Sequence, residues 1–218
     1  MTDTIVAIST AVGVGAISII RLSGPDAIKI VNQIFKGKNL EKVPTHTIHY
    51  GNIIDGEEII DEVLVSVMLS PKTFTTENVV EINCHGGIAT TNKVLELVLR
   101  KGARLAEPGE FTKRAFLNGR IDLIKAESVM DLIESKTDKA RKVAIAGISG
   151  KISDKIRTLR QNLVDLIANI EVNIDYPEYE DIEVVTKEKI ASQVFQMKEF
   201  LKKIIRESET GRLLTEGI

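Results

Sequence analysis

Apolar residues in the first half of the chain come in short runs separated by turn signals, a pattern typical of β-strands. Runs rich in isoleucine and valine predict strands at residues 4–9, 16–22, 46–54, 59–69 and 79–84, with a shorter one at 103–105. Asp55-Gly56 separates two of these runs. Because glycine tolerates a positive φ angle, this dipeptide predicts a hairpin.

Three helical stretches interrupt these strands. The first is expected from Gly24-Pro25 to about Phe35, with the proline near the first turn, where its missing N–H costs little. The second begins after residues 85–87 and stops at Gly102, and the third covers residues 111–118. Strands interleaved with helices predict a domain of mixed α and β structure, which we assign to the α+β class.

Beyond Gly119 the apolar spacing changes to steps of three and four, which predicts helices almost to the end of the chain. One apolar stripe runs from Ile148 to Ile170 and a second from Ile190 to Ile204. Tyr176-Pro177 and the acids that follow, up to residue 183, interrupt the helical pattern between them. Two long helices joined in this way are expected to pack antiparallel, with residues 126–133 supplying a third helix of an all-α segment.

Composition narrows the functional classes. The 218 residues are 43% hydrophobic and 28% charged, with a net charge of −2, so no global field attracts nucleic acid or acidic lipid. A single cysteine excludes an internal disulfide framework. No apolar run approaches the length of a membrane span, and the first residues lack the features of a signal peptide, so a cytoplasmic location without membrane contact is expected. Aromatic residues, at 4%, are too few for a stacking platform.

Nucleotide-binding motifs are incomplete. Gly13 and Gly15 lack the third glycine of a dinucleotide fingerprint, since Ser18 stands there, and they lead into a strand. Around Gly150-Lys151, isoleucines occupy positions 145 and 152, where a phosphate-binding loop needs glycine and serine or threonine. These residues therefore predict no GTP or ATP site.

The sequence gives equally little support for a metal site or for a catalytic nucleophile. Cys84 and His85 are neighbours on a predicted strand, so their side chains should point to opposite faces. His46, His49 and His85 give no zinc-ligand spacing. We expect Cys84 to be a small buried apolar residue, with no catalytic residue and no metal ligand in this chain.

Three charged residues stand in unusual places. Arg21 interrupts the apolar strand at 16–22, Glu81 interrupts the strand at 79–84, and Arg120 follows the Asn118-Gly119 turn. A charge inside a core strand is costly unless it is paired or faces a cleft. Two interpretations remain open on the pattern: Arg21 and Glu81 form an internal ion pair, or they line a ligand pocket.

Several motifs resemble the tRNA-modification GTPase family known as MnmE or TrmE. They are DTIVA at residues 3–7, GAISIIRLSG at 15–24, FTTENVVEINCHGG at 74–87, PGEFTKRAFLNGRIDL at 108–123, and GRLLTEG at 211–217. Ala126-Glu127 and residues 131–133 also fit, and all stand in the family's order. The resemblance covers essentially the whole chain, and the run at 108–123 is its most specific part.

The resemblance implies a folate site. In the family, the N-terminal domain resembles folate-binding aminomethyltransferase domains, has a mixed sheet and binds 5-formyltetrahydrofolate, a stand-in for the one-carbon donor. The family's folate contacts fall on Arg21, Glu81 and Arg120. Arg120 is often lysine in relatives, and arginine keeps the charge but changes its geometry. A further contact and a cysteine motif lie near the family's far C-terminus, outside this chain.

The family further implies that 5-formyl- or 5,10-methylene-tetrahydrofolate supplies a one-carbon unit for C5 of the wobble uridine in tRNA. A flavin-containing partner called MnmG or GidA completes that active site, and the N-terminal domains form a homodimer. A GTPase domain with Mg²⁺ and K⁺ follows GRLLTEG, so the chain is expected to stop before it. Residues 1–119 would then form the folate-binding, dimerising domain and residues 120–218 the first part of the helical domain.

Three further hypotheses accompany this assignment. The main alternative is a stand-alone folate-dependent aminomethyltransferase; a purely structural dimerisation module would leave Arg21 and Glu81 unexplained. Residues 136–160 carry eight basic side chains and two acidic ones, an excess that either contacts tRNA phosphates or forms a solvated helix face.

Overall fold

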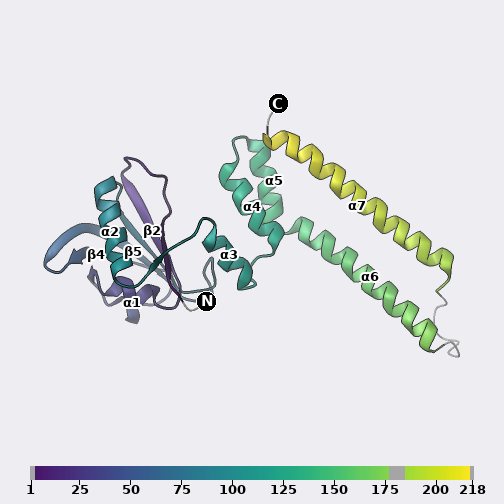
Figure 1. The fold of residues 1–218 in the computed structure, drawn as a ribbon, viewed down its shortest axis with the longest axis horizontal. Helices are drawn as coiled ribbons and strands as arrows, with labels where there is room; N and C mark the ends of the chain where they lie inside the picture. The colour runs from purple at the N-terminus through teal and green to yellow at the C-terminus, as the bar shows by residue number, and fades with distance from the viewer. Residues whose placement is uncertain (1–2, 177–184, 217–218) are drawn as a thin grey trace. The chain divides into compact units, whose positions relative to one another are not determined.

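The computed structural model describes residues 3–176 and 185–216, and the side chains as far as residue 206 (Figure 1). The chain divides into two compact units, residues 1–121 and 122–218. This division lies two residues beyond the domain boundary expected from the sequence. The first unit holds the sheet and the second is helical, so the α+β domain followed by an all-α segment is confirmed.

One mixed sheet of seven strands organises the first unit, in the order β3-β4-β5-β6-β2-β1-β7. All neighbours pair antiparallel except β1 and β7, which are parallel. The strands are β1 Ile5–Ile8, β2 Ile17–Ser23, β3 Phe35–Lys36, β4 Thr47–Asp55, β5 Glu58–Met68, β6 Val79–His85 and β7 Arg104–Leu105. The hairpin expected at Asp55-Gly56 joins β4 to β5, and Gly56 has the φ of 64° that favours glycine there.

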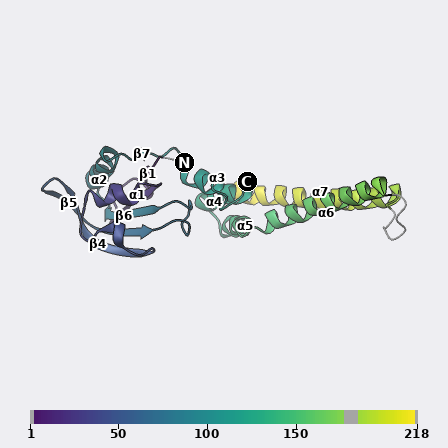
Figure 2. The same ribbon diagram turned by 90° about the horizontal axis from the view of Figure 1, so that it is seen from below.

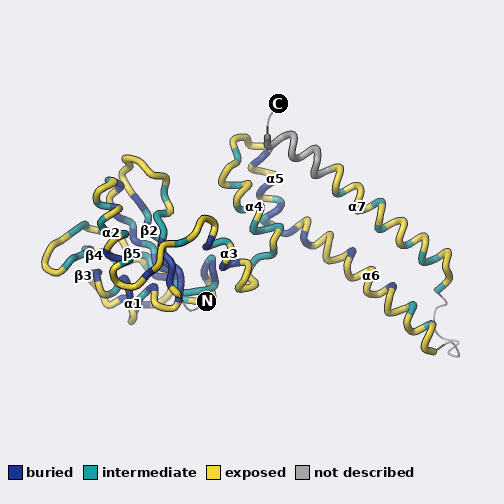
Figure 3. Tube along the Cα trace, viewed as in Figure 1, coloured by how far each residue is buried: buried dark blue, intermediate teal, exposed yellow. Residues whose placement is uncertain are grey.

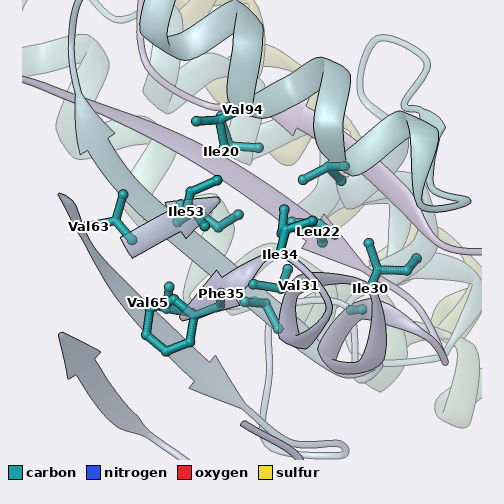
Figure 4. Packing of buried hydrophobic residues seen from close by; sticks show 14 of the residues in the cluster. Ile20, Leu22, Ile30, Val31, Ile34, Phe35, Ile53, Val63, Val65 and Val94 are labelled. Atoms are coloured by element: carbon teal, nitrogen blue, oxygen red, sulfur yellow. The ribbon is translucent and has the colours of Figure 1, made fainter. Parts of the chain in front are cut away.

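Helices α1 (Ala27–Asn32) and α2 (Ile88–Arg100) lie on one face of this sheet (Figure 2). Alternate residues of β2 and β6 point at them, so that Ile20, Leu22 and Ile82 are fully buried. Figure 4 shows Val94 of α2 above Ile20 in this core. The short helix η1 (Leu40–Lys42) adds Leu40, and α3 (Glu110–Leu117) completes the unit. Burial of this apolar face fixes which side chains of each strand point inward, so the alternate side chains lie on the opposite face of the sheet.

The expected helix to Phe35 is wrong at its end. Helix α1 stops at Asn32, whose side-chain oxygen accepts the backbone N–H of Leu40. Phe35 instead begins β3 and pairs with Ile53 of β4. Its ring is buried against backbone where only glycine fits, because a Cβ on Gly51 would lie 2.6 Å from the ring. Burial of the ring and the strand pairing together outweigh local helix propensity here.

The second unit contains α4 (Leu123–Glu134), α5 (Asp138–Ile148), α6 (Lys151–Asp175) and α7 (Lys187–Glu216). The helix expected at residues 126–133 is confirmed within α4. The apolar stripe that begins at Ile148 spans a break, since Gly150 adopts a φ of 82° between α5 and α6. Helix α5 lies against α4 at Gly147, where even a Cβ would lie 2.0 Å from the Ser128 hydroxyl.

Helices α6 and α7 run antiparallel, as expected, but they do not form a tightly packed pair (Figure 1). A hollow of about 580 Å³ lies between them, and polar side chains such as Asn162, Gln193 and Gln196 line it beside Leu159 and Phe200. Most residues of α6, and of α7 as far as residue 206, are exposed (Figure 3). The connection at residues 177–184, the last residue of the GRLLTEG motif (217) and residue 218 lie outside the described residues.

Candidate functional site

The face of the sheet opposite α1 and α2 carries Arg21 and Glu81, two of the three charged residues singled out by the sequence. Strand register places the side chains of this face in rows across the strands. One row holds Ala7, Arg21, Glu81, Ser66 and Ile48, in that order from β1 to β4. The face is therefore partly open and bears a charged pair among apolar neighbours.

Arg21 and Glu81 are direct cross-strand partners on β2 and β6. Arg21 Nε donates to Glu81 Oε1 at 2.7 Å, and Arg21 Nη2 lies 2.6 Å from the same oxygen. The side chains remain 34% and 20% exposed, respectively, so the pair is locked together but is not sealed from solvent. The ion pair expected in one of the two interpretations is therefore present, and it lies on a face that solvent reaches. The ring of Phe111 from α3 lies against Arg21, 5.9 Å from the guanidinium carbon.

Arg120 lies at a separate place, just after α3. Its Nη1 donates to the carbonyl of Phe74 at 3.0 Å, and its guanidinium carbon lies 5.1 Å from the centre of the Phe74 ring. An open hollow of about 500 Å³ adjoins it, and ten residues line this hollow: His46, Met68, Pro71, Lys72, Thr73, Phe74, Thr76, Asn118, Gly119 and Arg120. We call it the Arg120 hollow.

Strand register connects the Arg120 hollow with the charged pair. Met68 lines the hollow and pairs with Val79, while Glu81 pairs with Ser66, on the same face and one row along. Met68 and Glu81 are therefore diagonal neighbours, a relation that places Cα atoms about 7–8 Å apart. The structure brings Arg21 and Glu81 into contact with each other. It does not bring Arg120 into contact with them, and places it at the adjoining end of the same face.

A buried cluster, which the sequence did not indicate, holds this region together. Arg114 of α3 has no exposed surface and donates to Asp3 Oδ1 at 2.9 Å, to Glu110 Oε1 at 3.1 Å and to both oxygens of Glu77 at 3.2 Å. Arg104 contacts Glu110 and Asp3 from the solvent side. We call these five residues the Arg114 cluster.

The charged residues of the Arg114 cluster shift one another's pKa values. The hydrogen bond from Arg104 is the main cause that lowers the pKa of Glu110 to about 2, with Arg114 and the backbone N–H of Glu107 adding to it against the effect of burial. Burial by itself would lower the pKa of the Arg114 guanidinium, but Glu110, Glu77 and Asp3 outweigh it and raise that pKa. In the cluster, three carboxylates therefore face two guanidinium groups, and these opposite charges stabilise one another.

Glu77 extends the Arg114 cluster to the segment that carries Phe74. Ser23 of β2 donates to Glu77 Oε2 at 2.6 Å and shares a 2.6 Å hydrogen bond with Thr75. Asn118 donates to the carbonyl of Thr75, also at 2.6 Å. The cluster therefore fixes the segment at residues 73–78 and helix α3, the two elements that place Phe74, Phe111 and Arg120.

Cys84 and His85 lie on opposite sides of β6, as expected. The Cys84 thiol is buried and donates weakly to the carbonyl of Ser18 at 3.4 Å, and burial raises the pKa of that thiol. The exposed ring of His85 lies 2.6 Å from Asp61 Oδ1, and this hydrogen bond raises the pKa of the imidazole. Among the described residues, no three His, Cys, Asp or Glu side chains gather where they could hold a metal ion. No helix in the described ranges is long and apolar enough to span a membrane.

The basic stretch at residues 136–160 lies on α5 and α6, and part of its charge is paired locally. Arg141 and Lys142 both contact Asp138, at 2.8 and 2.9 Å, and Arg157 contacts Asp154 at 3.1 Å. These are exposed pairs one helical turn apart, of the kind that solvated helix faces usually carry. They reduce the local positive excess available to phosphates.

In this chain an α+β sheet domain precedes an all-α domain. Residues 4–120 match the family model described as the N-terminus of the GTP-binding protein TrmE, and residues 123–218 match the MnmE helical domain. The chain belongs to the family of the tRNA modification GTPase MnmE.

Individual relatives agree with this assignment. The chain is 59% identical over 218 residues to a tRNA modification GTPase MnmE of Ligilactobacillus salivarius, an alignment that covers 99% of this chain and 47% of the relative. It is 57% identical to those of Streptococcus thermophilus and Bacillus thuringiensis, with 99% of this chain and 47% and 48% of the relatives covered. The chain thus spans about half the length of the curated relatives it matches.

Proposed function

We propose that the first unit binds a reduced folate, 5-formyl- or 5,10-methylene-tetrahydrofolate, on the open face of its sheet. The observation that carries this proposal is the Arg21–Glu81 pair, which is accessible to solvent and stands one row from the Arg120 hollow. A folate has a heterocycle that donates hydrogen bonds at one end and carboxylates at the other. Glu81 offers a hydrogen-bond acceptor for the heterocycle, and Arg120, at the adjoining end of the same face, offers a cation for the carboxylates.

The Arg21–Glu81 contact leaves room for this role. The two Arg21 nitrogens that contact Glu81, Nε and Nη2, both lie at Oε1, so among the described residues Oε2 has no partner. Oε2 can accept from the amino-pyrimidine edge of the pterin, and a small rotation of the carboxylate would let both oxygens take part. Phe111 and Phe74 offer ring faces beside the two arginines, where a conjugated ligand can pack. Arg120 would hold the anionic tail.

When bound, the folate supplies a one-carbon unit, and this chain's residues bind and orient its carrier. In the whole protein we propose that this unit serves modification of tRNA at C5 of the wobble uridine, in a GTP-hydrolysing enzyme that works with a flavin-containing partner protein, MnmG. The names of the relatives support a role in tRNA modification. The match of residues 123–218 to the MnmE helical domain favours this assignment over a stand-alone aminomethyltransferase.

Isothermal titration of the chain with 5-formyltetrahydrofolate tests the folate proposal directly. We expect a saturable heat, because the acceptor and cation sites are already formed on the sheet. A titration without saturable binding up to millimolar ligand would contradict the proposal. Folic acid, whose oxidised pterin ring is planar, serves as the comparison ligand for specificity.

We also propose that the sheet units form a homodimer through the apolar part of this open face. The next row along carries Ile19, Asn83, Leu64 and Tyr50, and Ile48 and Ile17 lie in the rows on either side. Leu64 is 46% exposed and Tyr50 67%. A run of exposed apolar side chains on a flat sheet face is typical of a protein interface. Pairing of two such faces would also bring two folate sites close together.

Replacing Leu64 with lysine should convert the dimer to a monomer. A lysine at the centre of the apolar rows would place an unpaired charge in the interface, whereas the exposed position should leave the free energy of unfolding within about 0.5 kcal/mol. Light scattering coupled to size exclusion measures the mass. Ile59→Lys is the control, since Ile59 is 60% exposed at the hairpin end of the same strand. A monomeric native chain, or a dimer that survives Leu64→Lys, would contradict the interface.

A further inference from the structure

The Arg120 hollow is larger and holds more basic side chains than one carboxylate requires. Three of the ten lining residues, Arg120, Lys72 and His46, bear a guanidinium, an ammonium and an imidazole, and none of the ten is acidic. Only Nη1 of Arg120 is hydrogen-bonded to a described residue, so most of the five N–H donors of this side chain remain for a ligand. Lys72 is exposed at the edge of the hollow. This arrangement suits a chain of several negative charges.

Backbone conformation marks the same hollow. In the described ranges, His46 and Thr76 are the residues other than glycine with a positive φ, at 59° and 61°, and both line the Arg120 hollow. The left-handed region is unfavourable for side chains with a Cβ and persists where surrounding contacts hold it. The Thr76 segment is held by the Arg114 cluster through Glu77, and His46 by a strand-like N–H bond to the Val67 carbonyl. The wall of the hollow is therefore built before any ligand arrives.

We propose that the Arg120 hollow binds the γ-linked glutamate chain of polyglutamylated folates, so that folates with several glutamates are the preferred ligands. This inference rests on the folate proposal: with the pterin at Glu81, the tail would come within reach of the hollow, because Met68, which lines it, is a diagonal neighbour of Glu81. The first glutamate of the tail reaches Arg120. Each further glutamate adds one α-carboxylate, which Lys72 and His46 are positioned to receive along the hollow.

The expected gain is modest and salt-dependent. Exposed ion pairs contribute little individually, so two additional contacts correspond to an affinity gain of roughly 3- to 10-fold. Because such charges are screened over about 8–10 Å at ordinary ionic strength, the gain should shrink in 0.5 M salt. The affinity for the monoglutamate should change much less with salt, since the contacts at Glu81 and the packing against the aromatic rings are short-range.

Titration calorimetry with the mono- and pentaglutamate forms of 5-formyltetrahydrofolate tests this inference. The chain should bind the pentaglutamate roughly 3- to 10-fold more tightly. Lys72→Gln should remove most of this difference while leaving monoglutamate affinity within about twofold, because Lys72 lies beyond the first carboxylate. Lys101→Gln is the matched control, since Lys101 is an exposed lysine at the end of α2, whose helix covers the opposite face of the sheet.

The outcomes separate the two proposals. If neither folate binds, the folate proposal fails. If both forms bind equally well, or if Lys101→Gln and Lys72→Gln have the same effect, the folate proposal stands and the tail assignment fails. A pentaglutamate preference that survives Lys72→Gln would also overturn the assignment of the chain to this hollow.

Discussion

Replacing Arg114 with methionine should lower the free energy of unfolding of the sheet unit by about 3–5 kcal/mol. Arg114 is fully buried and donates to Asp3, Glu77 and Glu110. Methionine fills much of the same volume but leaves the carboxylate of Glu77, which is only 11% exposed, without its cation. An uncompensated buried charge is among the most destabilising changes a domain can undergo. Urea denaturation followed by circular dichroism measures the loss.

Arg104→Met provides the matched control for this prediction. Arg104 contacts two of the same carboxylates, Asp3 and Glu110, but its removal leaves Glu110 still paired with Arg114 and leaves Asp3, which is 45% exposed, open to water. We expect a loss of about 1 kcal/mol for this variant. Equal losses for the two variants would mean that burial does not decide the energetics of the cluster. A loss below 1 kcal/mol for Arg114→Met would show that Asp3, Glu77 and Glu110 do not depend on it.

The Arg114 cluster also explains why the most specific sequence motifs of the chain are rich in charge. Arg114 and Glu110 come from the motif at residues 108–123, Glu77 from that at 74–87 and Asp3 from that at 3–7. In the folded unit these motifs meet, and the cluster fixes α3 and the segment at 73–78 against β2. Their charges therefore act on the proposed folate site through position, since Phe111, Phe74 and Arg120 stand on the elements that the cluster holds.

Local patterns were sufficient to predict most strands and helices. Period-two apolar runs and the Asp55-Gly56 turn are short-range signals, and they place β4 and β5 correctly. The break at Gly150 was missed because Ile148 and Ile152 keep a four-residue spacing across it, so the apolar stripe reads as one helix. The end of α1 was missed because the residue that fixes it, Phe35, pairs with Ile53, eighteen positions later in the chain.

Long-range pairing limited what could be predicted of the site. The pattern singled out Arg21 and Glu81, but it could not tell an ion pair from a ligand site, because that depends on the register between β2 and β6, sixty residues apart. Arg114 resembled an ordinary surface charge, since its partners Asp3 and Glu77 lie 111 and 37 residues away. Lys72 and His46 gave no sequence signal at all. They share the Arg120 hollow because the start of β4, which follows His46, pairs with the end of β5, which precedes Lys72.

Replacing Glu81 with alanine should weaken binding of 5-formyltetrahydrofolate by about 100-fold or more. A carboxylate that accepts two hydrogen bonds from a heterocycle contributes about 1.5–3 kcal/mol for each, and its direct cross-strand neighbours, Arg21 and Ser66, offer no carboxylate to replace it. Stability should change little, by about 1 kcal/mol or less, because the Arg21–Glu81 pair is partly exposed and Arg21 can turn to solvent. Calorimetric titration measures the affinity, and a thermal melt of the same sample measures the stability.

Glu62→Ala is the appropriate control, because Glu62 is an exposed carboxylate on the same sheet face, on the neighbouring strand β5 and two rows from Glu81. It should leave both folate affinity and the melting temperature near those of the native chain. Native affinity in Glu81→Ala would refute the pterin contact, and a collapse of folding in that variant would make the pair a structural element of the sheet. Glu81→Gln sharpens the result: the amide keeps one acceptor but turns a donor toward the donors of the pterin, so its affinity should fall nearly as far as that of the alanine variant.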